Sequence, residues 1–498
     1  MSIRQKSGVI LGLLSFAIVL FLPVPVDMDP KALRALAVSI LMAIFWVTEA
    51  ISIFSTAFIP VALFPLLGVL NADHIAASYG HHIVLLILGA FLVAKAIETN
   101  NLHKRIALFT ILLIGTSRKY IILSFMISTA FLSMWTSNNS TTLMMLPIGL
   151  AIIQRERYLG VKDTAFGSAL MLSIAYSASI GGTGTLIGTP PNLLFVSTME
   201  EIFPKSPNLV FIDWLKIGIP FIAVFLPIAW FFIIKYFNIN GPLHGSEDII
   251  NNEYHDLGSI STAEKRVLII CIFYALGFVF RRNMHIGEYT IPGWSNILGV
   301  QMYAKDATVA FLAATLMFLI PNGLLNRNGE QKKLLDWDDA KTIPWGIAML
   351  IGGGMAIAAA FRETGLIIWI GANLELTGVS VFFILILAVT SMVFLTEINS
   401  NTATTAVFLP VLAGISKAGN FHPYLLMIPA TIAASCAFML PSGTGPNASI
   451  LASGEVTIPT MAKCGFWLNI IAIIIIIFLL YFIIMPTFGI NKTVPNWI

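Results

Sequence analysis

TSNNSTT, residues 136–142, is a run of small polar residues between two apolar segments, LSFMISTAFLSMW and LMMLPIGLAII. Burying such hydroxyl and amide groups without partners costs roughly a few kcal/mol each. A second run, TEINSNTATT, residues 396–405, has the same character in the second half of the chain. Two such runs inside apolar sequence predict helix breaks whose backbone and side-chain oxygens serve a ligand.

The surrounding composition is that of a helical membrane protein. Of the 498 residues, 57% are hydrophobic and 11% are charged, whereas soluble domains have about 25% charged residues. The apolar runs are long and continuous, which excludes an outer-membrane barrel of alternating strands. The net charge of +3 gives no indication of nucleic-acid binding. The three cysteines lie in apolar surroundings without metal-ligand spacing and are expected to be buried small side chains.

The order of apolar and polar segments predicts how the chain is organised. Several apolar pieces are too short for a full span and end at polar or glycine-rich breaks, which is typical of hairpins and broken helices. The N-terminal segment resembles a signal peptide but lacks a clear cleavage site, so a retained helix is expected. The expected parts are an N-terminal transmembrane helix (1–30), a first repeat (31–245), a polar connector (246–265) and a second repeat (266–498). Arg4 and Lys6 favour a cytoplasmic N-terminus.

Three blocks recur in the same order in the two halves. SNNSTTLMMLPIG from Ser137 matches SNTATTAVFLPVL from Ser400, and the offset from Gly89 to Gly352 upstream is the same. Downstream, IGTPPNLL (187–194) matches SGTGPNAS (442–449). This is an internal duplication. If each half has an odd number of spans, the halves are inverted in the membrane and the two polar runs meet near the midplane.

The residue types at the breaks suit both a cation and an anion. Hydroxyl, amide and carbonyl oxygens are ligands for a hard cation such as Na⁺, whereas N–H groups at the start of a half-helix suit a carboxylate. Polar residues in a single transmembrane helix more often join helices, but two copies at equivalent places favour a ligand site. Glu49 and Glu397 could carry protons, although structural pairing is the favoured interpretation. No Ser–His or Asp pair is visible at membrane depth, so an enzyme is not expected. A passive channel is a further alternative, but the duplicated broken helices favour alternating access.

These blocks resemble the divalent anion–sodium symporter family, the di- and tricarboxylate transporters with paired Ser-Asn-Thr motifs. The bacterial sodium-coupled dicarboxylate symporters are the most similar members. The resemblance also rests on the stretches TEAISI (48–53), IPWGIAMLIGGG (343–354) and AFMLPSGTGPN (437–447). It implies an all-α polytopic membrane protein with about eleven transmembrane helices, two re-entrant hairpins and two inverted repeats. It further implies a homodimer in the bacterial inner membrane that works by an elevator motion.

The resemblance also implies the site residues. One sodium ion would be held by Ser133, Ser137, Asn138 and the backbone of Gly188. A second would be held by Thr396, the backbone of Asn399, Asn401 and the backbone of Gly443. The substrate carboxylates would meet Asn138, Asn139, Thr189, Asn401, Thr402 and Thr444. The implied function is sodium-coupled symport of dicarboxylates of the succinate, malate and fumarate type.

The chain departs from the family pattern at two of these positions. Asn139 stands where the family has Thr, and Gly445 stands where it has the first proline of the partner loop. These departures leave the identity of the acid open. Thr141 stands where sodium-independent exchangers often carry Arg, which favours sodium coupling. The alternatives are a sodium-independent anion exchanger and a carrier of citrate or sulfate.

Overall fold

The computed structural model describes residues 2–114, 117–160, 163–242, 246–286, 289–325, 331–373, 380–491 and 495–498. In the first half of the chain the helices are α1 (Ile3–Phe21), α2 (Pro30–Thr48), α3 (Ile53–Thr56), α4 (Ile59–Leu66), α5 (Ala72–Tyr79), α6 (His82–Thr99), α7 (Leu102–Ile114), α8 (Arg118–Ser133), α9 (Asn138–Tyr158), α10 (Thr164–Gly182), α11 (Pro190–Ile202), α12 (Phe211–Tyr236) and α13 (Ser246–Asp256).

The second half is also mostly helical. Its helices are α14 (Thr262–Val279), α15 (Trp294–Ile297), α16 (Asp306–Leu319), α17 (Trp337–Ala340), α18 (Trp345–Glu363), α19 (Leu366–Asn373), α20 (Val381–Ile398), α21 (Asn401–Ala418), α22 (Tyr424–Ala434), α23 (Gly445–Ala452), α24 (Ile458–Leu479) and α25 (Met485–Phe488), with a π-helical segment at Leu480–Ile484 between the last two. Two short antiparallel hairpins add a little β structure: β1 (Met284–Ile286) pairs with β2 (Tyr289–Ile291), and β3 (Pro321–Leu325) pairs with β4 (Gln331–Lys333).

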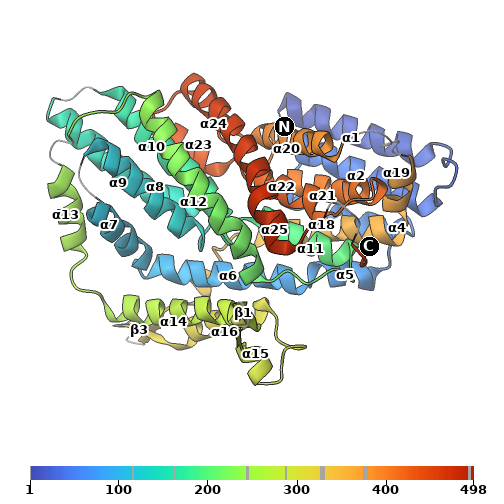
Figure 1. Ribbon diagram of the computed structural model, residues 1–498, viewed down its shortest axis with the longest axis horizontal. Coiled ribbons are helices and arrows are strands. Elements are labelled where there is room, and N and C mark those ends of the chain that lie inside the picture. Colours follow the sequence, from blue (N-terminus) through green and yellow to red (C-terminus); the bar gives the residue numbers. More distant parts are fainter. Residues whose placement is uncertain are drawn as a thin grey trace.

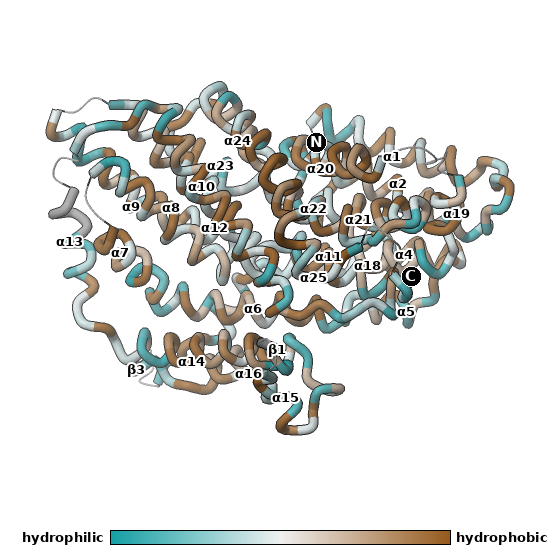
Figure 2. Tube along the Cα trace, viewed as in Figure 1, coloured by the Kyte–Doolittle hydropathy of each residue, from teal (hydrophilic) through white to brown (hydrophobic). Residues whose placement is uncertain are grey.

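The helices have the length and composition of membrane spans. Among the described residues, eight are long and apolar enough to cross a bilayer. Figure 2 shows continuous hydrophobic stretches along α12 and α24, with hydrophilic residues gathered in the connections. Many large apolar side chains on α1 are exposed, as expected of a helix that faces lipid. The chain is therefore a multi-pass membrane protein. The count of eleven spans stays a prediction, because several of the remaining helices are short or broken.

The two predicted hairpins are present. α8 and α9 form the first, with the polar run 136–142 at its tip, and α20 and α21 form the second, with its tip at 399–400. The hairpins occupy different parts of the helical array in Figure 1, and α10 and α22 lie beside them. Ser133 at the end of α8 and Thr396 near the end of α20 are completely buried. The ends of these two helices therefore lie inside the protein, whereas Asn139 and Ser140 at the first tip are exposed.

Each hairpin is accompanied by a broken helix from its own half. α10 and α11 are separated by the loop 183–189, and α22 and α23 by the loop 435–444. The helix after each loop packs against the opposite half: α11 contacts α21 and α22, whereas α23 contacts α9 and α10. Each loop lies against the hairpin of its own repeat, and the start of α23 reaches the other hairpin, where Gly445 lies against Asn139.

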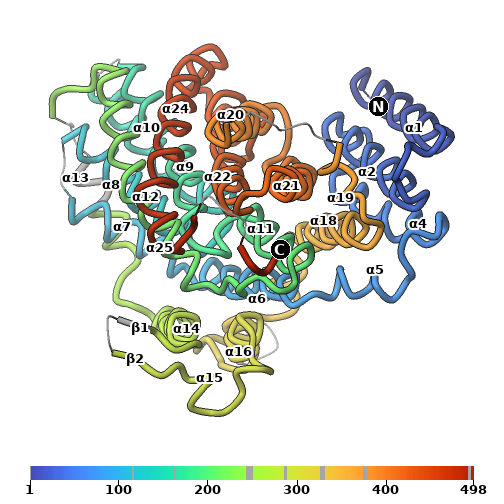
Figure 3. The backbone as a smooth tube through the Cα atoms, turned by 45° about the vertical axis from the view of Figure 1, so that its right-hand side comes forward, coloured from blue at the N-terminus to red at the C-terminus, as the bar shows by residue number. Residues whose placement is uncertain are grey.

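The remaining segments lie around this core. α14 and α16 pack against each other, and α16 packs on α6; Figures 1 and 3 both show this pair at the edge of the molecule together with α15 and the β hairpins. Residues 246–265, expected to be a polar connector, contain helix α13, which packs on α7 and α9. Lys104 and Glu253 form an ion pair of 2.7 Å there.

Candidate functional site

A cavity of about 470 Å³ lies where the two tips meet the two loops. Most of its polar lining comes from segments 137–140, 188–190, 400–402 and 442–446, and Glu49 and Thr342 add to it. All but three of the residues implied as sodium or substrate ligands line it. The exceptions are Ser133, Thr396 and Asn399, which are buried behind its wall. The structure thus brings both polar runs and both glycine-rich loops into one site.

The first tip contains a compact group of oxygens. Ser133 Oγ lies 2.6 Å from Asn138 Oδ1 and 2.7 Å from the carbonyl oxygen of Ala178. A hydroxyl has one proton, so it can donate to only one of these two acceptors. Gly188 belongs to the same group, because a Cβ added there would come within 3.0 Å of the Ser133 carbonyl oxygen. Several oxygens thus converge with a single side-chain proton among them, a donor set that suits a hard cation.

The second tip repeats this arrangement. Thr396 Oγ1 lies 2.6 Å from Asn401 Oδ1 and 2.8 Å from the carbonyl oxygen of Ala434. A Cβ added at Gly443 would come within 3.0 Å of the Thr396 carbonyl oxygen. Thr396 has the same offset from Ser133 as Ser400 has from Ser137. The duplication in sequence is therefore a duplication of two oxygen clusters.

Two other implied sodium ligands are placed differently. Ser137 caps α9: its Oγ accepts from the Ser140 N–H at 3.2 Å and contacts Ser140 Oγ at 2.9 Å. Ser137 also lines the cavity. Asn399 ends α20, and its Nδ2 donates to Thr404 Oγ1 at 3.3 Å. The Asn399 Oδ1 is buried without a partner in the described part of the chain.

The two loops end in equivalent threonines. Thr189 immediately precedes α11 and Thr444 immediately precedes α23, and neither side chain makes the usual capping hydrogen bond to its helix. Prolines in the first turn fix the start of both helices. Both hydroxyls are therefore available to a ligand in the cavity. The buried amides of Asn192 and Asn447 hold the loops by donating to the carbonyl oxygens of Thr185 at 2.7 Å and Leu440 at 3.0 Å.

The charges around the cavity are few. Its lining, as drawn from the described residues, contains Glu49 but no Lys, Arg or His. Glu49 lies at the end of α2 in the left-handed conformation (φ 48°). A bound dianion would therefore find no basic side chain in contact with it, and its charge would have to be offset by cations.

Glu397 holds the second loop in place. Its carboxylate accepts from the backbone N–H groups of Phe438, Met439 and Leu440 at 2.7–3.0 Å. It also accepts from Asn469 Nδ2 at 2.7 Å. With these donors around it, the carboxylate has the structural role favoured from the sequence.

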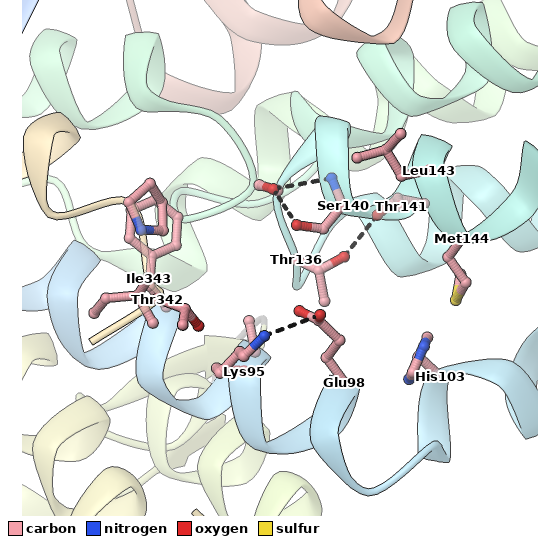
Figure 4. A pocket seen from close by; sticks show the side chains of 14 residues that line it. Lys95, Glu98, His103, Thr136, Ser140, Thr141, Leu143, Met144, Thr342 and Ile343 are labelled. Carbon is pink, nitrogen blue, oxygen red and sulfur yellow. Dashed lines mark hydrogen bonds and ion pairs between the residues drawn. The ribbon is translucent and has the colours of Figure 1, made fainter. Parts of the chain in front are cut away.

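A second cavity of about 370 Å³ adjoins the first and shares five lining residues with it: Phe91, Ser137, Ser140, Thr342 and Pro344. Figure 4 shows Lys95 and Glu98 on α6 facing the residues of the first tip across this space. Lys95 Nζ and Glu98 Oε1 are 3.0 Å apart. On the opposite wall, Thr136 Oγ1 and Thr141 Oγ1 are 2.6 Å apart. Lys95 therefore lies beside the first cavity but is not part of the lining of that cavity.

Sequence reasoning missed the carbonyl groups of Ala178 and Ala434. A backbone carbonyl has no residue-specific signature, and the offset between these two alanines is shorter than that between the two tips. The only signal was their position shortly before the glycine-containing loops. The cluster of His81, His82 and Glu200 lies outside the cavity. The Ile83 N–H donates to His81 Nδ1 at 3.4 Å, which leaves Nε2 of His81 directed to Glu200, with Nε2 to Oε2 at 3.6 Å.

Known proteins resemble the chain over nearly its full length. The sodium-dependent dicarboxylate transporter SdcS of Staphylococcus saprophyticus is 40% identical over 503 residues, covering 99% of this chain and 94% of the relative. The protein of that name from Staphylococcus aureus is 39% identical over 509 residues, with the same coverage.

Two solved structures share the fold. Neisseria gonorrhoeae MtrF, described within a class of antimetabolite efflux pumps, has a TM-score of 0.56 at 13% identity and covers 99% of this chain and 96% of its own. The Alcanivorax borkumensis YdaH transporter has a TM-score of 0.50 at 13% identity, covering 83% and 90%. Residues 5–487 match the family described as the sodium:sulfate symporter transmembrane region. The chain belongs to this family of membrane transporters.

Proposed function

We propose that this protein is a secondary transporter that carries a dicarboxylate of the succinate, malate or fumarate type into the cell together with sodium ions. The observation that carries the proposal is the pair of equivalent oxygen clusters beside a cavity without basic residues. The names of the staphylococcal relatives, which are sodium-dependent dicarboxylate transporters, support both the substrate and the ion.

The proposed sodium ligands divide between the two tips. The first set is Ser133, Ser137, Asn138 and the backbone of Gly188, joined by the Ala178 carbonyl. The second set is Thr396, the backbone of Asn399, Asn401 and the backbone of Gly443, joined by the Ala434 carbonyl. In both sets an Asn ends the cluster and also lines the cavity, so one side chain contacts ion and acid. This shared residue would couple the binding of sodium to the binding of the acid.

The acid is proposed to lie between the two tips. Asn138, Asn139 and Thr189 from the first repeat, and Asn401, Thr402 and Thr444 from the second, supply neutral hydrogen-bond donors. Neutral donors orient a carboxylate but do not cancel its charge. The ions in the neighbouring clusters offset that charge, because Coulomb interactions are strong where water is excluded. Binding of the acid therefore favours binding of sodium, and the reverse.

The same architecture suits alternating access. Since each broken helix packs against the opposite half, both tips and both loops form one interlocked unit. Such a unit would carry the whole site through the membrane without taking it apart. The inverted repeats, the elevator motion and the homodimer implied by the family resemblance belong to this proposal. A cavity with two polar ends favours a dicarboxylate over sulfate, which is compact.

The test is uptake of radiolabelled succinate into proteoliposomes containing the purified protein. We expect uptake with an inward sodium gradient and little uptake when potassium replaces sodium, because the dianion is then left without its counter-ions. Liposomes without protein are the control. Equal uptake in potassium would overturn sodium coupling, and uptake only into liposomes preloaded with dicarboxylate would indicate an exchanger. Competition by unlabelled citrate or sulfate that exceeds competition by succinate would overturn the substrate class.

A further inference from the structure

Asn139 and Gly445 come from opposite repeats and contact each other. Asn139 lies at the tip of the first hairpin, whereas Gly445 is the first residue of α23. A Cβ added at Gly445 would overlap the carboxamide of Asn139, so the absence of a side chain at 445 makes room for it. Both residues line the cavity. The larger side chain at position 139 is therefore accommodated by the missing side chain at position 445.

The duplication supplies the comparison. The residue equivalent to Asn139 at the second tip is Thr402, and the residue equivalent to Gly445 in the first loop is Pro190. Both of these also line the cavity. The Asn139–Gly445 pair thus combines a larger tip residue with a glycine, whereas the equivalent positions have a smaller tip residue, Thr402, and a proline, Pro190.

The two ends also differ in the hydrogen bonds that they can donate. The carboxamide of Asn139 has two N–H donors, and the backbone N–H of Gly445 has no partner within its helix because it belongs to the first turn. Thr402 has a single hydroxyl donor, and Pro190 has no backbone N–H. The Asn139–Gly445 end is therefore richer in donors and the Thr402–Pro190 end is poorer.

We infer that this asymmetry orients the substrate and selects dicarboxylates with a hydroxyl or keto oxygen next to one carboxylate. Such an acid has one end with three oxygens and one end with two. The end with three oxygens binds at Asn139 and Gly445, and the plain carboxylate binds at Thr402 and Pro190. This inference rests on the proposed function, since it assumes that a dicarboxylate occupies the cavity.

The experiment measures competition by malate, 2-oxoglutarate and succinate against sodium-dependent uptake of labelled succinate. The variants are Asn139→Thr, Gly445→Pro and the double variant, which gives both ends the Thr–Pro composition. Asn240→Thr is the matched control, because Asn240 is an exposed loop residue that bonds Asn238. Size-exclusion profiles in detergent check the folding of every variant, and Asn139→Ser replaces Asn139→Thr if the latter does not fold.

We expect wild type and Asn240→Thr to prefer malate and 2-oxoglutarate over succinate. Asn139→Thr should lower this preference about tenfold, as expected from the loss of one hydrogen bond to a charged ligand. Gly445→Pro alone should lower uptake of all three acids about tenfold or more, because the ring overlaps Asn139. The double variant should regain succinate uptake without regaining the preference.

The outcomes separate this inference from the proposed function. If wild-type protein shows no sodium-dependent succinate uptake, the proposed function fails and the inference fails with it. If uptake is sodium-dependent but Asn139→Thr leaves the ranking of competitors unchanged, the substrate is correct and the orientation is wrong. If the double variant is as impaired as the product of the single effects, the two residues act independently and the matched pair is refuted.

Discussion

The two loops beside the transport cavity have equivalent positions but are held by different chemistry. In the first repeat, neutral groups hold the loop: Trp214 Nε1 donates to the loop carbonyl of Thr183 at 2.8 Å, and the loop hydroxyl of Thr185 donates to the Met134 carbonyl at 2.5 Å. In the second repeat, the loop donates its own N–H groups to the carboxylate of Glu397. Met134 is the residue equivalent to Glu397.

This difference means that the halves need not tolerate the same changes. The first loop is supported by several neutral hydrogen bonds, each worth about 0.5–1.5 kcal/mol net. The second loop also receives hydrogen bonds from the Asn447 amide, but three of its backbone N–H groups share one buried carboxylate, which accepts from the Asn469 amide as well. Removing a single acceptor from a buried network leaves all of its donors unpaired, so the second repeat is the more vulnerable to a point substitution.

The largest effect is expected at Glu397. Glu397→Ala removes the acceptor for three backbone N–H groups and the Asn469 amide, each costing about 1–3 kcal/mol when left unpaired and buried. Sodium-dependent succinate uptake should fall about a hundredfold or more. Met134→Ala, at the equivalent position, should retain at least about half of wild-type uptake. Similar losses of uptake in both variants would show that the two loops are held in the same way. Normal uptake by Glu397→Ala would show that Glu397 is not needed to hold the second loop.

The next effect tests whether the two oxygen clusters are equivalent. Asn138→Ala and Asn401→Ala each remove an oxygen from a cluster and a donor from the cavity. Each should weaken the apparent affinity for sodium and succinate about ten- to a hundredfold, the range expected for one charge-assisted hydrogen bond. The measurement is initial uptake rate against sodium concentration. A loss in only one variant would show that one cluster alone binds sodium.

The smallest effect separates the hydroxyl from the methyl group of Thr396. Thr396→Ser keeps the hydroxyl and should change the apparent sodium affinity by no more than about threefold, at a modest packing cost. The matched variant Thr396→Val keeps the volume but removes the hydroxyl, and should weaken the affinity about tenfold. The equivalent residue in the first repeat is Ser133, so a serine at position 396 should be tolerated. A larger loss with serine than with valine would assign the position to packing.

Much of the site could be predicted because its sequence motifs occur twice in the chain. Two polar runs in apolar sequence, at matching offsets, identified the tips, and the paired glycine-rich blocks identified the loops. Of the residues inferred by resemblance, the structure gathers Asn138, Asn401, Thr189 and Thr444 around one cavity. The carbonyls of Ala178 and Ala434 could not be predicted, because any residue offers the same carbonyl group and only the fold selects which one faces the cluster.

The sequence by itself determined that this is a helical membrane protein, duplicated, with paired polar breaks. These properties follow from residue type and spacing, which act locally through hydrophobicity and backbone preference. Only the tertiary structure decided which residues meet across the repeats. Asn139 touches Gly445, and Glu397 accepts from a loop some forty residues along the chain, because α23 packs on the first repeat and the second loop folds back on its own hairpin. Such contacts depend on the path of the whole chain, so no local pattern records them.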